Sequence, residues 1–358
     1  MAKNRDPVIV HTEDENIGRP PKFIIVVGAS AGGLTALGEL VTYFKTGMDA
    51  AVCIVLHLSR TGIGDFLMQR LQPLTPLACR MGKAGMAIER DCIYIAPPNG
   101  HLLVKEDKII IGHGPEENRW RPSIDVLFRS AAVAYDGHTI GIILTGLLND
   151  GTAGMMAIKK SGGACIVQDP NEAEYPDMPL SVLNSLEVDY CVPLSGMADA
   201  IGEVLQKKVS APKQRVPEEI KTESVIAEKM ATSLEMPAKL GEKSVYACPD
   251  CGGGLWLIKD GNLDRYRCHI GHSYTEKDLV LKQGEQIEST LWVALRMMEE
   301  RTALLKKMEN ERRQRGFMRT AAYQQQRVDE LQMHIDELKK LIFQIQHNTN
   351  NDVRLNLP

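Results

Sequence analysis

The β-branched and aromatic run Phe23–Val27 leads directly into Gly28-Ala29-Ser30-Ala31-Gly32-Gly33, and a helical pattern begins at Leu34. In a G-x-S-x-G turn between a strand and a helix, small residues on both sides of the serine allow a sharp bend that exposes its hydroxyl. The helix that starts just after Ser30 directs free backbone N–H groups at any anion formed there. The turn therefore predicts a nucleophilic Ser30 at the end of a buried strand.

Short β-branched runs alternate with helical patterns from residue 22 to about residue 207, which predicts an α/β fold with a doubly wound, mostly parallel sheet. The expected strands are Phe23–Val27, Val52–Leu56, Cys92–Ala96, Thr139–Leu144 and Ala164–Val167, with a β-hairpin inserted within His101–Gly112. The expected helices are Leu34–Phe44, Gly64–Leu71, Ser123–Tyr135, Gly151–Ser161 and Met197–Gln206. Ligand sites in such sheets lie at the carboxyl ends of the strands.

With 358 residues, the chain exceeds the roughly 250–300 residues at which a single core stops growing, so we expect several domains. We divide it into a flexible leader (1–21), the α/β domain (22–207), a linker with one short helix (208–243), a Cys/His module (244–274), helices (275–347) and a tail (348–358). In the helical region, two apolar series with spacings of 3 or 4 flank Gly316. They predict either an antiparallel hairpin or a coiled-coil homodimer.

The composition is that of a globular protein, with 44% hydrophobic and 25% charged residues and a net charge of −4. This charge offers no electrostatic reason to bind nucleic acid or a membrane surface. No apolar run approaches the roughly 20 residues of a membrane span, and the N-terminus lacks a signal-peptide core. Outside one group of three cysteines, we expect the others to be reduced, buried thiols: Cys53, Cys79, Cys92, Cys165 and Cys191. These features favour the cytoplasm.

A serine nucleophile needs a base and a group that orients the base. His57 ends the expected strand Val52–Leu56, and Asp150 follows the strand Thr139–Leu144. In a parallel sheet both would reach the same edge as Ser30. Singly, each residue has a simpler explanation, because serine often caps a helix, histidine can be a satisfied polar core residue, and Asn-Asp-Gly often forms a turn. Together at three strand ends they favour a Ser-His-Asp triad.

The main alternative for the glycine-rich turn is a dinucleotide site, which would make the protein an oxidoreductase. Such folds usually place an Asp or Glu at the end of the next strand to hold the ribose hydroxyls. This chain has His57 there, followed by Leu58-Ser59-Arg60. An acid is missing where a cofactor would need it, and a base is present where a serine would need it.

Several segments of residues 23–207, in the right order, resemble the catalytic domain of CheB-type chemotaxis methylesterases. They are Val27–Gly33, Val55–Leu58, Ile95–His101, Arg121–Phe128, Leu144–Gly146 with Asn149–Gly151, and Gln168–Pro170 with Ala173–Pro179. The resemblance implies a serine hydrolase that cleaves γ-glutamyl methyl esters on chemoreceptor helices and releases methanol. Some members of the family also deamidate receptor glutamines. The nucleophile, base and orienting carboxylate of the family map onto Ser30, His57 and Asp150.

We assign the oxyanion and substrate contacts to Ala31, Leu147 and Arg121. The alternative for Arg121 is that it only precedes a helix begun by Pro122 and Ser123. The family pattern before the aspartate, T/S-G-x-G-x-D, has its second glycine replaced here by Leu148. We expect a positive φ there, which Leu adopts at a cost of about 1–2 kcal/mol.

The replacement by Leu148 favours an alternative function, a non-catalytic scaffold that binds signalling partners through the Cys/His module and the helices. A second departure from the family is that only about 21 residues precede the first strand. We therefore expect no attached receiver domain, and the means of regulation stays open.

Two Cys/His pairs, Cys248-Pro-Asp-Cys251 and Cys268-His-Ile-Gly-His272, are separated by 16 residues. Paired ligands at such spacing predict a structural, tetrahedral zinc site with no open position for catalysis. We expect His272 as the fourth ligand, because His269 adjoins Cys268 and would strain the chelate. The alternative is a redox-active CxxC pair. The segment resembles a zinc-ribbon-like tail found on some CheB-like proteins, and no cofactor is expected for catalysis itself.

Overall fold

A computed structural model of the chain describes residues 20–57, 64–208, 215–229 and 236–355. Most of the expected leader (residues 1–19 of 1–21), the segment 58–63 with Leu58-Ser59-Arg60, parts of the linker and residues 356–358 lie outside the described residues. The chain divides into two compact units, Met1–Glu276 and Lys277–Pro358, which are considered separately below.

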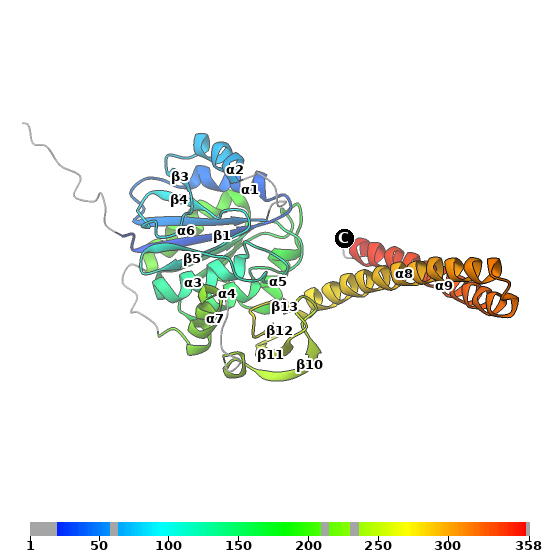
Figure 1. The fold of residues 1–358 in the computed structure, drawn as a ribbon. Coiled ribbons are helices and arrows are strands. Elements are labelled where there is room, and N and C mark those ends of the chain that lie inside the picture. Colours follow the sequence, from blue (N-terminus) through cyan, green and yellow to red (C-terminus); the bar gives the residue numbers. More distant parts are fainter. Residues whose placement is uncertain (1–19, 58–63, 209–214, 230–235, 356–358) are drawn as a thin grey trace, which may run out of the picture. The chain divides into compact units, whose positions relative to one another are not determined.

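The first unit is built on a seven-stranded sheet in the order β3-β4-β2-β1-β7-β8-β9, with all neighbouring strands parallel (Figure 1). Its strands are β1 (Phe23–Ala29), β2 (Ala50–Leu56), β3 (Ala78–Met81), β4 (Cys92–Ile95), β7 (Thr139–Ile143), β8 (Ala164–Gln168) and β9 (Tyr190–Val192). The predicted α/β class is confirmed. The two edge strands, β3 and β9, were not predicted, because they are short and lack a continuous apolar run.

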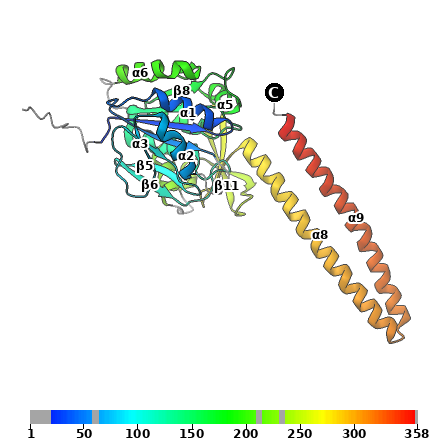
Figure 2. The ribbon, with the colours of Figure 1, turned by 90° about the horizontal axis from the view of Figure 1, so that it is seen from above.

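Helices cover both faces of this sheet and form two separate cores (Figures 1 and 2). One core contains α1 (Gly33–Leu40), α2 (Gly64–Leu71) and α6 (Met197–Lys208). The other contains α3 (Ile124–Tyr135), α4 (Thr152–Lys160) and α5 (Asp177–Ser185), of which α5 was not predicted. Residues of β1 alternate between the two cores, so the strand is apolar throughout, as expected for a strand buried on both faces.

The predicted hairpin consists of β5 (His101–Lys105) and β6 (Lys108–Gly112). Glu106 and Asp107, at its turn, both have positive φ angles of 47° and 58°. Helix α7 (Glu218–Lys229), within the expected linker, contributes Ala227 to a small core with Leu103 of β5. Short 3-10 turns lie at Val41–Tyr43, Gln72–Leu74, Asp136–His138, Leu194–Gly196 and Pro237–Lys239.

The Cys/His module is a four-stranded antiparallel sheet in the order β10-β11-β12-β13 and belongs to the first unit. Its strands are β10 (Glu242–Ala247), β11 (Gly254–Asp260), β12 (Leu263–Cys268) and β13 (Ser273–Thr275). Among the cysteines expected to be buried, Cys191 is exposed, because it lies on the edge strand β9 where one side faces solvent.

The second unit is a helical hairpin of α8 (Glu276–Gln314) and α9 (Met318–Leu355), turning at Gly316 with a φ of 81° (Figure 2). Leu295 of α8 packs with Ile335 and Ile342 of α9, so the two predicted seams face each other within one chain. Whether two hairpins associate stays a prediction. Within the described ranges, no helix combines the length and the apolar character that a membrane crossing requires.

The close packing of α4 against α3 depends on Gly154. A Cβ built on Gly154 would lie 2.5 Å from the Cβ of Phe128 and 3.1 Å from the Cα of Asp125. Gly154→Ala should therefore lower the free energy of unfolding by about 1–3 kcal/mol, because the helices must move apart. The matched control is Gly202→Ala in α6, where nothing lies within 4 Å of the new Cβ. Urea unfolding of both variants checks this, and equal stability of the two would contradict it.

Candidate active site

Ser30 and His57 follow two adjacent strands. The register of β1 with β2 pairs Ala29 with Leu56, so Ser30 and His57 are the next residue along each strand. The His57 backbone N–H donates to the Ala29 carbonyl at 3.1 Å, and that of Ser30 donates to the Thr145 carbonyl after β7 at 3.0 Å. Strand pairing therefore brings the predicted nucleophile and base to the same edge of the sheet.

The imidazole of His57 is hydrogen-bonded to Asp150. Nε2 of His57 lies 2.9 Å from Oδ2 of Asp150, and the two side chains are only 1% and 3% exposed. The other ring nitrogen, Nδ1, is buried and has no hydrogen-bond partner in the described parts of the chain. One nitrogen is thus committed to the carboxylate, which leaves Nδ1 to act on the proton of a neighbouring group.

Five donors surround the Asp150 carboxylate. They are His57 Nε2 (2.9 Å), Asn118 Nδ2 (3.0 Å), Ser123 Oγ (3.0 Å), and the backbone N–H groups of Ile124 (2.7 Å) and Asp125 (3.2 Å). Three of these donors are at the N-terminus of α3, where backbone N–H groups lack partners within the helix. Burial by itself would raise the pKa of Asp150, but the hydrogen bonds and the His57 charge outweigh burial and lower it. Asp150 is therefore ionised.

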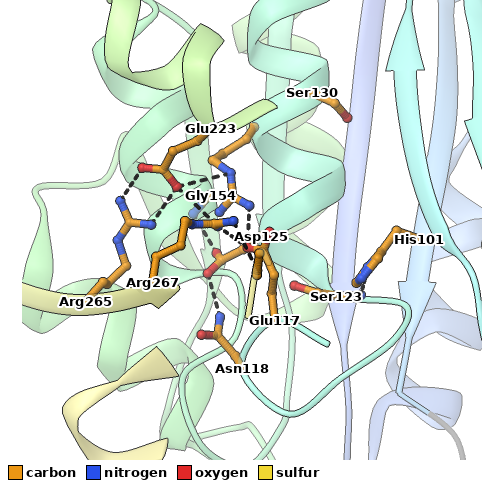
Figure 3. A network of polar contacts seen from close by, with 12 residues as sticks. His101, Glu117, Asn118, Ser123, Asp125, Ser130, Gly154, Glu223, Arg265 and Arg267 are labelled. Carbon is orange, nitrogen blue, oxygen red and sulfur yellow. Dashed lines mark hydrogen bonds and ion pairs between the residues drawn. The ribbon is translucent and has the colours of Figure 1, made fainter. Parts of the chain in front are cut away.

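A second buried carboxylate, Asp125, lies beside the first. Its Oδ1 accepts the backbone N–H groups of Gly151 (3.0 Å) and Gly154 (2.6 Å), and its Oδ2 accepts Asn118 Nδ2 at 2.7 Å (Figure 3). Burial and the charge of Asp150 raise the pKa of Asp125 to about 7. The amide of Asn118 therefore bridges two carboxylates, of which Asp150 carries the charge and Asp125 is partly protonated near neutral pH.

Trp120 stacks on the His57 ring, with centroids 4.1 Å apart and ring planes at 7°. It ends a tight turn in which its N–H donates to the Glu117 carbonyl at 3.0 Å. The central residues, Asn118 and Arg119, have φ angles of 50° and 69°, which non-glycine residues rarely adopt. Sequence analysis named neither Asn118 nor Trp120. The sequence offered one indication of a role at the site, because both residues directly precede Arg121-Pro122-Ser123. No regular spacing marks them as site residues.

The loop after β7 packs against Ser30. A Cβ on Gly146 would lie 2.8 Å from the Ser30 Cβ and 2.2 Å from Met178 Sδ, so the backbone here needs glycine. Leu147 is 38% exposed, and Leu148 has the expected positive φ, at 66°. Leu148 therefore has the strained backbone conformation that was expected, and the loop lies against Ser30.

On the other side of Ser30, Ala31 precedes α1, and its carbonyl accepts the Thr145 hydroxyl at 3.1 Å. Arg121 donates to Asn99 Oδ1 at 2.6 Å and to the Gly114 carbonyl at 2.8 Å, so it joins two loops. Ser123 is the N-cap residue of α3, and its hydroxyl is directed to Asp150.

The predicted metal ligands also come together. The ligand atoms of Cys248, Cys251, Cys268 and His272 all lie within 4.8 Å of one another. The Sγ atoms of Cys251 and Cys268 are 3.7 Å apart, and Cys268 Sγ lies 3.5 Å from His272 Nδ1. Ligands placed about 2.3 Å from a tetrahedral ion would be about 3.8 Å apart. This group can therefore hold a metal ion.

A parallel α/β sheet that brings Ser30, His57 and Asp150 to the ends of three adjacent strands defines a candidate serine-hydrolase site. The family model described as CheB methylesterase matches residues 25–201. A protein of Leptospira interrogans is 37% identical over 176 residues, which cover 49% of this chain and 91% of that protein. The chain belongs to the CheB methylesterase family.

Two further similarities each cover about half of the chain. A Methanosarcina mazei protein named protein-glutamate methylesterase/protein-glutamine glutaminase 2 is 34% identical over 191 residues, 51% of this chain and 52% of that protein. The crystal structure of the Thermotoga maritima CheB methylesterase catalytic domain is 28% identical, with a TM-score of 0.48, covering 51% of this chain and 98% of that one. The family match ends before the Cys/His module.

The raised pKa of Asp125 predicts a pH-dependent contribution to stability. An acid that binds its proton more tightly when folded loses stability as pH rises from its unfolded pKa, near 3.8, to its folded pKa, about 7. Asp125→Asn stays neutral and escapes this loss. The free energy of unfolding of the variant, relative to wild type, should therefore improve between about pH 4 and 7 and stay constant above about pH 8. Urea unfolding across pH measures this, and a pH-independent difference would contradict it.

Proposed function

We propose that this chain is a cytoplasmic serine hydrolase that cleaves glutamate γ-methyl esters on chemoreceptor-like proteins to glutamate and methanol. The observation that carries the proposal is the buried hydrogen bond between His57 and Asp150, next to the strand end that bears Ser30. Membership of the CheB methylesterase family supports the same chemistry. The name of the Methanosarcina relative supports a second reaction, deamidation of glutamine.

In the proposed mechanism, His57 Nδ1 takes the proton of Ser30 as Oγ attacks the ester carbonyl. Nδ1 is the base because Nε2 is committed to Asp150, whose ionised carboxylate orients the ring and stabilises the imidazolium. The imidazolium then protonates the departing methanol oxygen, and an acyl-enzyme remains on Ser30.

In the second half of the reaction, His57 removes a proton from water as the water oxygen attacks the acyl-enzyme carbonyl. The bond to Ser30 Oγ then breaks, the imidazolium returns its proton to Oγ, and the glutamate side chain is released. We assign the oxyanion to backbone N–H groups on both sides of Ser30, including those of Ala31 and Leu147. The positive φ of Leu148 supports this assignment, because it keeps the backbone of this loop against Ser30. Losing one oxyanion donor typically costs about 10²–10³ in rate. A glutamine side chain would follow the same route with ammonia as the leaving group.

We further propose that Cys248, Cys251, Cys268 and His272 hold a structural Zn²⁺. Their donor set and spacing suit tetrahedral zinc, and four protein ligands leave no position for a reacting molecule. When bound, the ion would stabilise the fold of the module and take no part in ester hydrolysis.

A second candidate function is that of a scaffold that binds signalling partners through the Cys/His module and α8–α9. The observation that favours it is the number of exposed apolar side chains on the helices, such as Ile287, Met297 and Leu304. A chemically inert Ser30 would favour this function over hydrolysis.

Ser30→Ala should lower methanol release from a methylated receptor helix by about 10³-fold or more, because no acyl-enzyme can form. The control is an unchanged thermal unfolding midpoint and circular dichroism spectrum. A fluorophosphonate should label Ser30 in wild type, and His57→Ala should abolish the labelling. Near-normal turnover by Ser30→Ala would refute the proposed mechanism.

Cys251→Ser should lose most of the bound zinc, because the variant keeps only three of the four ligands. The matched control is Cys191→Ser, which alters another exposed cysteine outside the group. Elemental analysis of the purified proteins gives the zinc content. Equal zinc in both variants would show that the site lies elsewhere.

A further inference from the structure

The Cys/His module contacts both loops that build the candidate active site. The carbonyl of Ser273 in β13 accepts the backbone N–H of Asn118 at 2.8 Å. The hydroxyl of Thr275, two residues along, accepts Nδ2 of Asn149 at 2.8 Å, and Asn149 directly precedes Asp150. Each loop thus has a hydrogen bond to the short strand β13.

A buried ionic network, defined here as Glu117, Arg129, Glu223, Arg265 and Arg267, joins β12 of the module to the turn bearing Asn118, to α3 and to α7 (Figure 3). Arg267 Nη2 of β12 lies 2.7 Å from Glu117 Oε2, and Glu117 also pairs with Arg129 of α3. Arg265 forms two hydrogen bonds, of 2.8 and 2.7 Å, with Glu223 of α7. All five side chains are at most 5% exposed, so removing one partner leaves a buried charge uncompensated.

The metal ligands adjoin the residues that make these contacts. Arg267 precedes Cys268, and Ser273 follows His272. The loop between the two ligands is closed by hydrogen bonds from the Cys268 N–H to the His272 carbonyl (3.0 Å) and from the Gly271 N–H to the Cys268 carbonyl (3.1 Å). An ion bound by Cys268 and His272 would therefore fix the positions of Arg267 and Ser273.

The turn that the module holds needs external support. Asn118 and Arg119 both have positive φ angles, so this backbone conformation persists only where its surroundings impose it. Glu117 and Asn118 receive that support from Arg267 and Ser273 of the module.

We propose that the Cys/His module is a positioning element of the active site, and that metal binding there sets the catalytic competence of His57 and Asp150. The proposal rests on the hydrolase function proposed above. By holding the turn of Glu117–Trp120, the module positions two side chains. Asn118 bridges the carboxylates of Asp125 and Asp150, and Trp120 stacks on the imidazole of His57. Asn118 and Trp120 are thus positioning residues. Loss of the metal frees the turn and lets the His57 ring leave its alignment with Asp150.

The first experiment compares the full chain as purified, after zinc removal by a chelator, and after zinc is restored. We expect the fluorophosphonate labelling rate of Ser30 and kcat for methanol release to fall at least tenfold without zinc and to recover with it. KM should change much less, because the contacts that the turn makes are with Asp150 and His57. Unchanged labelling and kcat in protein proven free of zinc would overturn the proposal.

One variant distinguishes loss of active-site positioning from unfolding of the module. Thr275→Val removes the acceptor of the Asn149 hydrogen bond and leaves all four metal ligands in place. We expect full zinc content, a severalfold lower kcat, and an unfolding midpoint lowered only by the loss of one buried hydrogen bond. Thr290→Val in α8, whose exposed hydroxyl bonds only its own helix, is the matched control and should match wild type. Equal kcat in both variants would count against the proposal.

A readout that needs no turnover distinguishes failure of this proposal from failure of the proposed function. The emission of Trp120 reports the stacking of its indole on the His57 ring in protein with Trp256→Phe and Trp292→Phe. In the Ser30→Ala background, we expect zinc removal to change the wavelength and intensity of this emission and zinc addition to restore them, because a freed turn no longer holds the indole on the ring. Unchanged emission without zinc would overturn the proposal, whether or not Ser30 proves to be a nucleophile.

Discussion

The site depends on one buried negative charge, the carboxylate of Asp150. A charge at this depth is tolerated only when hydrogen bonds replace the water it has lost. Here the N-terminus of α3, the amide of Asn118 and the imidazole of His57 supply that replacement. The hydrogen bond from His57 also fixes the orientation of the imidazole, so the interactions that stabilise the charge orient the candidate base as well.

The donors around Asp150 are supported by two different parts of the chain. Helix α3 and the strand ends belong to the family domain, but the turn bearing Asn118 and Trp120 is held partly by β12 and β13 of the Cys/His module. A segment outside the family match is therefore in hydrogen-bond contact with the site's own loops. The buried arginine–glutamate network makes this contact costly to separate, because Arg265 would lose Glu223 and Arg267 would lose Glu117.

Much of the site was predictable because the ends of buried strands can be recognised in the sequence. Ser30, His57 and Asp150 each follow an apolar run that is buried in the sheet, and the Cys/His spacing identified all four residues of the group that can hold a metal ion. The edge strands β3 and β9 were not predicted, because partly exposed strands have no continuous run of apolar residues. Cys191 was wrongly expected to be buried, because its apolar neighbours did not reveal that β9 is an edge strand.

The sequence by itself determined the parallel α/β class and the residues delivered to the sheet edge, because these follow from local patterns of polarity and size. The positive φ at Leu148 was expected only from comparison with the family pattern, which has a glycine there. Only the tertiary structure decided which ring nitrogen of His57 faces Asp150, that Trp120 covers the ring, and that Asn118 bridges two carboxylates. These contacts join residues whose separation along the chain has no periodicity. They arise from packing of whole elements, and no local pattern encodes them.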